Sequence, residues 1–168
     1  MSAPSAPNED LPTELPGVVL RRLTAVDAPQ YRALVHRNLV HLGRDGDWRD
    51  EVAATLAEIE RRFADHPDAD QTFGIFEWDT LIGQVTLVHG APTKWGLGYW
   101  LTAATTGRGV MTASIQAVLD HAQDALGATA VLASVSVGND ASTAVLDRLA
   151  FVAVARLTSS TRYRRTLH

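Results

Sequence analysis

The chain has 168 residues, 46% of them hydrophobic and 20% charged, a composition typical of a single globular domain with a sizeable core. The formal net charge of −4 argues against a nucleic-acid-binding surface over the whole molecule. The lack of cysteine excludes disulfides, cysteine–zinc sites and thiol catalysis. No apolar run approaches the ~18 residues of a membrane span, and residues 1–16 lack the basic and apolar regions of a signal peptide. We therefore expect a cytoplasmic protein with neither nucleic-acid nor membrane partners.

The N-terminal segment differs in composition from the rest of the chain. Residues 1–16 are rich in proline, serine and acidic side chains, so we expect a flexible tail there. No second composition shift and no internal repeat follows, which predicts one domain over residues 17–168. The apolar residues of 18–23 predict its first strand.

Two helices are expected next. The capping-box pattern at residues 24–27 opens a helix whose apolar positions continue to Leu42. The glycines and aspartates of residues 43–47 are expected to end it. Apolar residues at helical spacing then predict one continuous second helix over residues 48–64.

The middle of the chain has the pattern of a β-meander. Residues 71–78 and 81–89 are predicted strands, joined as a hairpin by a tight turn at Asp79-Thr80. After a turn at residues 90–93, a third strand is expected to end near residue 101. This part of the sheet is therefore expected to be antiparallel.

A glycine-containing loop follows that third strand and precedes a helix. The loop holds Gly107 and Gly109, and the helix ends at the C-cap glycine Gly127. Backbone N–H groups that converge at the positive end of a helix dipole favour phosphate, and Arg108 adds a positive charge. The loop lacks both the Gly-Lys-Ser/Thr of a Walker motif and the third glycine of a dinucleotide fingerprint. A tight turn without a ligand is the alternative interpretation.

The C-terminal third alternates strands with one short helix. A buried strand is predicted over residues 129–136, and a helix opens at residues 138–140. Residues 151–157 and 161–167 are predicted to be the last two strands. The resulting order, β-α-α-β-β-β-α-β-α-β-β, predicts an α/β-type domain that is antiparallel first and has a parallel crossover later.

Three separated segments, in this order and spacing, resemble the GNAT N-acetyltransferase superfamily, and within it the RimJ/RimL-type branch that acetylates ribosomal-protein N-termini. Residues 77–87 are similar to the hairpin of that family. Residues 97–112 are similar to its strand and pyrophosphate loop, and residues 136–151 to its Asn-x-x-Ser helix ending in Phe. The resemblance implies a mixed, mostly antiparallel central sheet of about seven strands, flanked by about four helices and splayed at the acetyl-CoA site.

Two residues depart from the pattern of the family. Thr106 stands where the loop usually begins with Gln or Arg, and Gly96 stands where the branch has an acidic residue. The resemblance implies direct transfer of acetyl from acetyl-CoA to a primary amine, with no metal and no covalent enzyme intermediate. The acceptor it implies is a protein N-terminal α-amine or a small-molecule amine such as an amino acid, an aminoacyl compound or an antibiotic, and a homodimer is a further expectation. The two departures keep open a second hypothesis, a non-catalytic coenzyme A-binding regulatory module.

The donor site follows from the same resemblance. The pyrophosphate is expected on the N–H groups of residues 107–112, and the pantetheine beside the strand at residues 99–101. The backbone N–H of Leu101 would stabilise the oxyanion, and Ser142 would act as the general acid for the leaving thiolate. Asn139 would contact pantetheine, cap the helix that follows it, or do both. The residues expected at the donor site are Tyr99, Trp100, Leu101, Thr102, Thr106, Gly107, Arg108, Gly109, Val110, Met111, Thr112, Asn139 and Ser142.

The acceptor side has fewer sequence signals. The residues expected there are Tyr31, His41, Trp48 and His89. The candidate general bases are His41, His89 and Glu77. An ε-ammonium of pKa ~10.4 costs about 4 kcal/mol to deprotonate near neutrality, whereas an α-amine of pKa ~8 costs about 1 kcal/mol. With Gly96 in place of an acidic residue, we expect an acceptor amine of low pKa that is deprotonated through water.

Overall fold

The computed structural model describes residues 10–45, 48–64 and 70–168. Most of the predicted tail, part of the predicted break at residues 43–47 and most of the turn after the second helix lie outside these ranges. The described part contains one eight-stranded sheet in the order β1-β2-β3-β4-β5-β6-β8-β7. Its strands are β1 (Leu11–Pro12), β2 (Val18–Arg22), β3 (Gln71–Glu77), β4 (Thr80–Ala91), β5 (Lys94–Leu101), β6 (Ala130–Ser136), β7 (Val152–Arg156) and β8 (Ser160–Thr166).

Every neighbouring pair in this sheet is antiparallel except β5 and β6, which are parallel. The predicted antiparallel meander and later parallel crossover are therefore confirmed. The expectation of about seven strands omitted β1, which pairs with β2 through Leu11 and Leu20. Leu15 also packs against the core, so the ordered chain begins inside the segment expected to be a tail.

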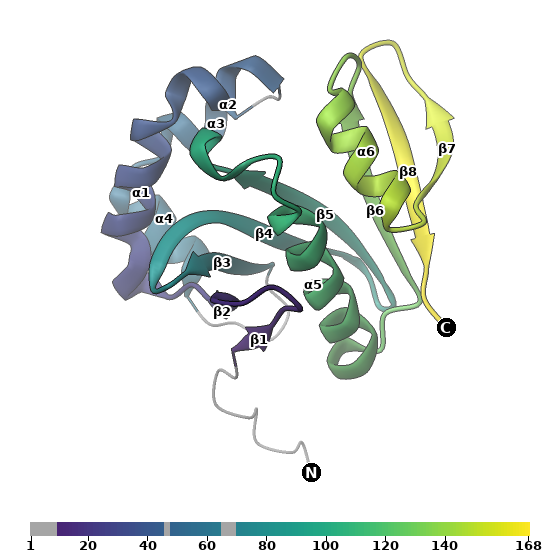
Figure 1. Cartoon of the computed structure of the whole chain (residues 1–168), viewed down its shortest axis with the longest axis horizontal. Coiled ribbons are helices and arrows are strands. Elements are labelled where there is room, and N and C mark those ends of the chain that lie inside the picture. The colour runs from purple at the N-terminus through teal and green to yellow at the C-terminus, as the bar shows by residue number, and fades with distance from the viewer. Residues whose placement is uncertain (1–9, 46–47, 65–69) are drawn as a thin grey trace.

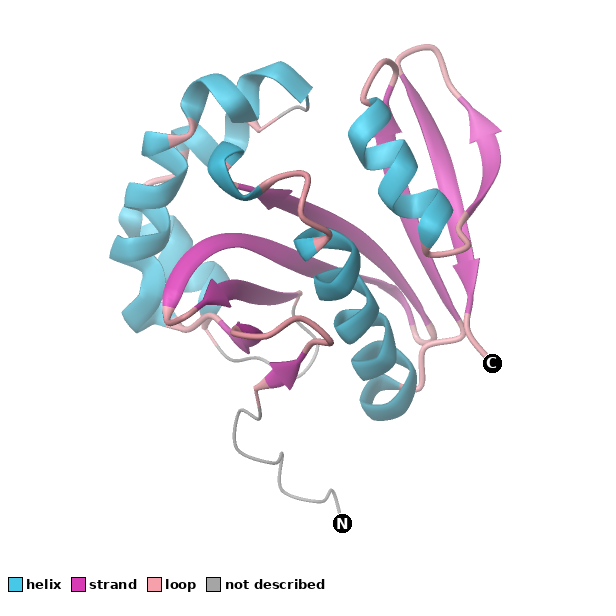
Figure 2. Ribbon diagram, viewed as in Figure 1, coloured by secondary structure: helices cyan, strands magenta, loops and turns pink. Residues whose placement is uncertain are grey.

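Helices cover both faces of the sheet (Figure 1). Their bounds are α1 (Ala28–Arg37), α2 (Leu39–Asp45), α3 (Arg49–Ala53), α4 (Leu56–Phe63), α5 (Val110–Leu126) and α6 (Asp140–Arg148), with short 3-10 turns at Ala25–Asp27 and Ala103–Thr105. The core on one face packs Ile115 and Leu119 of α5 against strand residues such as Ile75. The core on the other face packs Tyr31 and Ile59, from α1 and α4, against strand residues such as Phe76. Side chains that alternate along β3 thus enter two separate cores, and Figure 2 shows the helices in front of and behind the strands.

The two helices predicted for the first third are each divided. The first ends at Asn38, whose side-chain amide donates to Leu34 O at 2.9 Å, and α2 follows it. The predicted helix over residues 48–64 is broken at Ala54, whose ψ of 130° is extended. Thr55 and Glu58 form a reciprocal capping box that starts α4. The periodic apolar residues continue across this break, so periodicity alone predicted one helix over residues 48–64 where the structure has two.

The β3–β4 hairpin turns one residue earlier than predicted. Trp78 and Asp79 both have positive φ, 46° and 68°, the geometry of a two-residue turn that matches the twist of its strands. Trp78 is 73% exposed, and its indole lies so close to Gly17 that a Cβ there would come within 2.3 Å of the ring. Gly17 therefore leaves the space that this turn tryptophan occupies.

Candidate active site

The sheet opens between β5 and β6. Their parallel pairing stops at Leu97 and Ala133. On the outer sides the ladders continue, from β5 to β4 as far as Leu101 and from β6 to β8 as far as Ser136. The ends of the two central strands thus diverge while each stays paired to its other neighbour, which confirms the predicted splay. Figure 1 shows β6, β8, β7 and α6 leaning away from β4 and β5.

The backbone of β5 presents unpaired groups to this opening. The N–H of Thr102 donates to Ile82 O of the β4 strand at 2.8 Å. Because alternate residues of an antiparallel ladder direct their N–H and C=O groups to opposite sides, those of Tyr99 and Leu101 face the opening. An extended amide ligand, or the oxyanion of a tetrahedral intermediate, would find donors at these two residues.

The N-terminus of α5 lies beside the same opening. Its N-cap is Gly109, with φ 76° and no side chain to cap the helix. The first helical hydrogen bond runs from Ala113 N to Gly109 O at 3.1 Å, so the N–H groups of Val110, Met111 and Thr112 have no partner within the helix. Three unused donors at the positive end of a 17-residue helix favour a bound anion.

These elements enclose a cleft of about 550 Å³. Its lining comprises Glu14, Leu15, His41, Leu42, Trp48, Tyr99, Trp100, Leu101, Thr106, Gly107, Gly109, Val110, Met111, Thr112, Asn139, Ala141, Ser142, Ala144, Val145 and Arg148. Thr112 Oγ1 and the Tyr99 hydroxyl are buried in it without a hydrogen-bond partner among the described residues. Unpartnered buried polar atoms beside unused helix donors fit a polar, anionic ligand better than a filled core.

The start of α6 forms the opposite wall. Asn139 caps this helix, because its side-chain oxygen accepts from Ser142 N at 3.2 Å. The predicted capping role of Asn139 is thereby confirmed. The cap places Ser142 on the first turn, where it lines the cleft near the Tyr99 hydroxyl but outside hydrogen-bond geometry. Burial raises the pKa of Tyr99, and the neighbouring Ser142 opposes part of that rise.

Two of the predicted donor-site residues do not line the cleft. Thr102 is not part of the lining, and its hydroxyl lies 3.0 Å from that of Thr105. Arg108 turns outward and pairs with Glu77 through two hydrogen bonds of 3.0 Å. Because Arg108 donates to Glu77, the pKa of this carboxyl is lowered. The charge expected to assist the phosphates therefore anchors the loop to β3, and Glu77 is occupied as an ion-pair partner instead of being available as a base.

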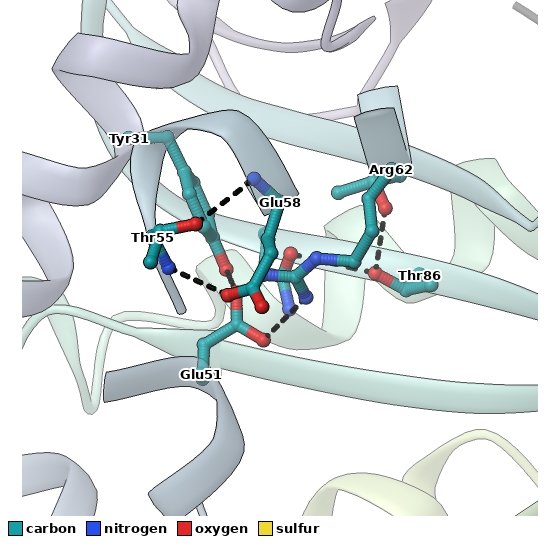
Figure 3. A network of polar contacts seen from close by, with 8 residues as sticks. Tyr31, Glu51, Thr55, Glu58, Arg62 and Thr86 are labelled. Carbon is teal, nitrogen blue, oxygen red and sulfur yellow. Dashed lines mark hydrogen bonds and ion pairs between the residues drawn. The ribbon is translucent and has the colours of Figure 1, made fainter. Parts of the chain in front are cut away.

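The predicted acceptor residues also separate into two groups. His41 and Trp48 line the cleft. Tyr31 is fully buried and donates a short hydrogen bond to Glu51, which Arg62 binds at 2.9 Å (Figure 3). This network ties α1, α3 and α4 together, and burial next to Glu51 raises the pKa of Tyr31 well above its usual value.

His89 lies at the far end of β4 from the opening. It pairs with Trp95, and its ring contacts that indole with centroids 4.8 Å apart. Its backbone N–H donates to Asp70. The structure therefore does not bring His89 to the cleft, and His41 is the remaining candidate base of the three.

Sequence reasoning missed several lining residues. Ala141, Ala144 and Arg148 of α6 line the cleft. They are spaced three and four residues apart, which puts them on one face of the helix, and this spacing could have been recognised in the sequence. Glu14 and Leu15 come from the loop between β1 and β2. No local sequence pattern identifies that loop as part of the cleft, because strand pairing with residues distant in sequence brings it there.

A second groove adjoins the cleft on the side of α2 and α3. It measures about 790 Å³ and runs between these helices and the β6–α6 loop. Trp48 and Asn139 line both spaces, so the groove meets the cleft where the sheet opens. Its lining comprises Leu39, Gly43, Arg44, Trp48, Arg49, Val52, Ser136, Val137, Gly138 and Asn139.

Two further features of the described ranges concern metals and membranes. Within them, no group of three or more His, Cys, Asp or Glu side chains is placed to hold a metal ion. No helix in the same ranges is long and apolar enough to cross a membrane.

Comparison with known proteins gives the family. The model of the acetyltransferase (GNAT) domain matches residues 18–152, while no curated protein sequence matches the chain. A structure of RimL, a ribosomal L7/L12 alpha-N-protein acetyltransferase in complex with coenzyme A, superimposes with a TM-score of 0.81 at 22% identity, covering 95% of this chain and 98% of that one. Mycobacterium smegmatis RimJ in complex with CoA-disulfide gives 0.77 at 23%, covering 94% and 86%. Spermidine N-acetyltransferase from Vibrio cholerae gives 0.73 at 18%, covering 89% and 94%.

At such identities the structural likeness shows the fold, and the family model adds the chemistry. That model spans β5 and β6 at the sheet opening, the glycine loop and the Asn-x-x-Ser helix. The unused donors of α5 and the orphaned hydroxyls fit the pyrophosphate and pantetheine of coenzyme A. The chain belongs to the GNAT acetyltransferase family and uses acetyl-CoA as its cosubstrate.

Proposed function

We propose that this enzyme acetylates the α-amine of a peptide or protein N-terminus, and that the groove between α2, α3 and the β6–α6 loop admits this acceptor. The observation that carries the proposal is the meeting of groove and donor cleft at the sheet opening, through Trp48 and Asn139. An amine entering by the groove would reach a thioester held beside β5 where the sheet opens. Direct attack needs this arrangement, with donor and acceptor held together.

The lining of the groove supports a peptide over a polyamine. Arg44 lines it, and none of its lining residues among those described is a carboxylate. Leu39 and Val137 are apolar and 44% and 70% exposed at its rim. A polycation such as spermidine, the acceptor named for one structural neighbour, would meet the like charge of Arg44 here. An N-terminus followed by apolar or acidic residues would meet apolar contacts and opposite charges.

The residues of the cleft take the following roles in this proposal. Acetyl-CoA supplies an activated acetyl thioester. The N–H groups of residues 110–112 hold its pyrophosphate, and the Leu101 N–H faces the thioester oxygen. Ser142 donates a proton to the departing sulfur. The acceptor α-amine loses its proton to water at a cost of about 1 kcal/mol near neutrality. A strong base is then not required, and His41 is the cleft residue that could assist.

The test measures thiol release from acetyl-CoA with matched acceptors. Two peptides that differ only in Asp or Lys at the third position are compared with an N-terminally blocked peptide, a free amino acid and spermidine. We expect the Asp peptide to give the highest kcat/KM, the blocked peptide none, and Arg44→Glu to reduce or invert the Asp-over-Lys preference, an effect that added salt weakens. A preference for spermidine would overturn the peptide proposal. Coenzyme A binding without thiol release from any amine would favour the non-catalytic module.

The quaternary structure is a separate matter. One structural neighbour is described as dodecameric. The homodimer expected for this chain stays a prediction, which sedimentation of the purified protein would test.

A further inference from the structure

The part of the sheet formed by β6, β8 and β7 has one face that none of the described helices covers. Buried residues of these strands, such as Ala133 and Tyr163, join the core on the α5 side, as does Leu146 of α6. Within the described ranges, the core formed with α1 and α4 contains no residue of β6, β7 or β8. Figure 2 shows α6 in front of these strands. Their other face is therefore open to solvent.

This open face carries two arginines. Arg162 and Arg164 flank the buried Tyr163 along β8, so their side chains lie on the open face about 7 Å apart. Arg162 lies opposite Ser134 of β6, and Arg164 lies opposite Val152 of β7. Neither guanidinium has a hydrogen bond or an ion pair with another described residue. We define the basic sheet face by five exposed residues, Ser134, Ser136, Val152, Arg162 and Arg164.

Protection of a sheet edge does not explain these two charges. Charged side chains are common on edge strands, where they discourage pairing with other chains. β8, however, is an interior strand that pairs with both β6 and β7. Two like charges about 7 Å apart also repel each other, and the chain as a whole has a net charge of −4. A local positive face on an acidic chain indicates an anionic partner.

The basic sheet face is continuous with the proposed acceptor groove. Ser136 lines the groove and lies on the same face of β6 as Ser134, two residues away. Asn139, where the groove meets the donor cleft, donates its N–H to Ser136 O at 3.1 Å. The ends of such a turn lie less than about 7 Å apart. A peptide that leaves the sheet opening through the groove therefore reaches Ser136 first and the two arginines next.

We propose that the basic sheet face binds an acidic stretch of the acceptor protein that lies a few residues after the acetylated N-terminus. This inference rests on the proposed function, in which a peptide acceptor enters by the groove. The partner chemistry follows from the arginines, because a guanidinium binds a carboxylate through two parallel hydrogen bonds. The same face would repel an acceptor that is basic in this stretch.

The spacing of the strands sets the positions involved. An extended chain advances about 3.4 Å per residue. With acceptor residue 1 at Asn139, residue 3 lies near Ser136, residue 5 near Ser134 and its partner Arg162, and residue 7 near Arg164. Acidic residues at positions 5 to 8 thus meet the two arginines of the face, whereas position 3 lies in the groove with Arg44.

The test compares acceptor peptides of twelve residues that differ only at positions 5 to 8, which are all aspartate, all serine or all lysine. A peptide of the four shared N-terminal residues reports on the groove alone. Thiol release from acetyl-CoA gives kcat/KM for each peptide. We expect the aspartate peptide to exceed the serine peptide by about three- to tenfold and the lysine peptide to fall below it. Added salt should reduce both differences.

Charge reversal identifies the residues responsible. Arg162→Glu combined with Arg164→Glu should remove or invert the preference for aspartate, with activity on the four-residue peptide unchanged. Arg156→Glu is the matched control on the same hairpin, because Arg156 pairs with Thr161, whose side chain lies on the other face of β8. This control should keep the preference of the wild type.

A second variant leaves both arginines in place. Ser134→Glu puts a carboxylate opposite Arg162, so it should compete with the peptide and weaken the preference. All the side chains replaced in these variants are exposed, so their Tm values should stay close to that of the wild type.

The outcomes separate this inference from the proposed function. Equal kcat/KM for the three long peptides, or a preference that survives the charge reversal, would overturn the docking face and leave the acceptor class intact. A single-stranded RNA of matched charge that inhibits more strongly than an N-terminally blocked aspartate peptide, through the same two arginines, would assign the face to nucleic acid instead. Absence of turnover with every peptide, including the one of four residues, would overturn the acceptor class itself.

Discussion

Replacing Gly109 with aspartate should separate donor binding from helix stability. Gly109 is the N-cap of α5, has φ 76°, and has open space where a side chain would begin. Gly127 at the other end of the same helix has φ 62° and equally open surroundings. The two glycines therefore impose the same backbone strain on a substituent but lie at opposite ends of the helix dipole.

The magnitudes predict opposite outcomes for the two variants. A left-handed conformation costs a non-glycine residue about 1–2 kcal/mol, and aspartate tolerates it better than most. At position 109 the positive end of the helix dipole stabilises the carboxylate by up to about 1 kcal/mol, which offsets part of this strain. At position 127 the negative end destabilises the carboxylate by a similar amount. Towards a diphosphate the carboxylate at position 109 is repulsive, by about 4 kcal/mol per charge pair at ~4 Å and an effective dielectric constant of ~20. That corresponds to a loss of affinity of about a thousandfold.

The assay is thermal unfolding with and without coenzyme A, supported by calorimetric binding. At a hundred times its dissociation constant, a ligand stabilises the native state by about 2.7 kcal/mol, which raises Tm by about 5–10 °C in a chain of this size. Gly109→Asp should keep a Tm near wild type and lose that shift. Gly127→Asp should have a lower Tm and keep the shift. Normal coenzyme A affinity in Gly109→Asp would refute the assignment of the pyrophosphate to this helix end, and equal loss in both variants would show that helix stability alone is responsible.

Two further predictions concern stability. Asp27 accepts two hydrogen bonds of 3.0 Å from Arg21, and these lower its pKa despite burial. Asp27→Asn should cost about 1–2 kcal/mol at neutral pH. Because the folded pKa is the lower one, the wild-type advantage should shrink as the pH falls from about 4 through that value, and a difference in urea unfolding independent of pH would contradict this account. Gly83→Ala would bring a Cβ within 2.3 Å of Trp100 O, so β5 must shift and Tm should fall by the equivalent of about 1–3 kcal/mol. Gly98→Ala on β5, which meets nothing within 4 Å, is the control, and equal Tm values for the two variants would contradict the proposed close approach.

The donor half of the cleft could be predicted from sequence because it is built locally. Strand β5, the loop of Gly107 and Gly109 and the first turn of α5 follow one another in the chain, so a short sequence pattern specifies their geometry. The cap of α6 by Asn139 is equally local. Arg108 shows the limit of such reasoning, because its direction depends on Glu77, which lies on a strand distant in sequence.

The acceptor half could not be predicted in the same way. Whether His89 reaches the site depends on the length and register of β4, which no local pattern gives. His89 pairs with Trp95 of β5, whereas the opening in the sheet begins after Leu97. Leu101, at the end of β5, pairs with Gly83. Six residues of strand at ~3.4 Å each separate His89 from Gly83, a distance of about 20 Å. Tyr31 fits a helical apolar stripe, and its burial against Glu51 follows from the separation of α3 and α4, which the predicted continuous helix concealed.

The opening in the sheet persists because each of its walls has its own support. On one side the β4–β5 ladder continues to Leu101, and Trp100 packs into the core formed with α1 and α4. On the other side the β6–β8 ladder continues to Ser136, and the fully buried Leu146 of α6 joins the core on the α5 side. Beyond Leu97 and Ala133, where the parallel pairing of β5 and β6 ends, each wall is held by its outer ladder and its own core contacts, so unpaired backbone groups remain at β5 without a collapse of the sheet. A ligand that forms these missing strand contacts binds without reordering either wall, which spares part of the entropy cost of association. Substitutions behind either wall, such as Gly83→Ala, should therefore weaken donor binding without touching the donor.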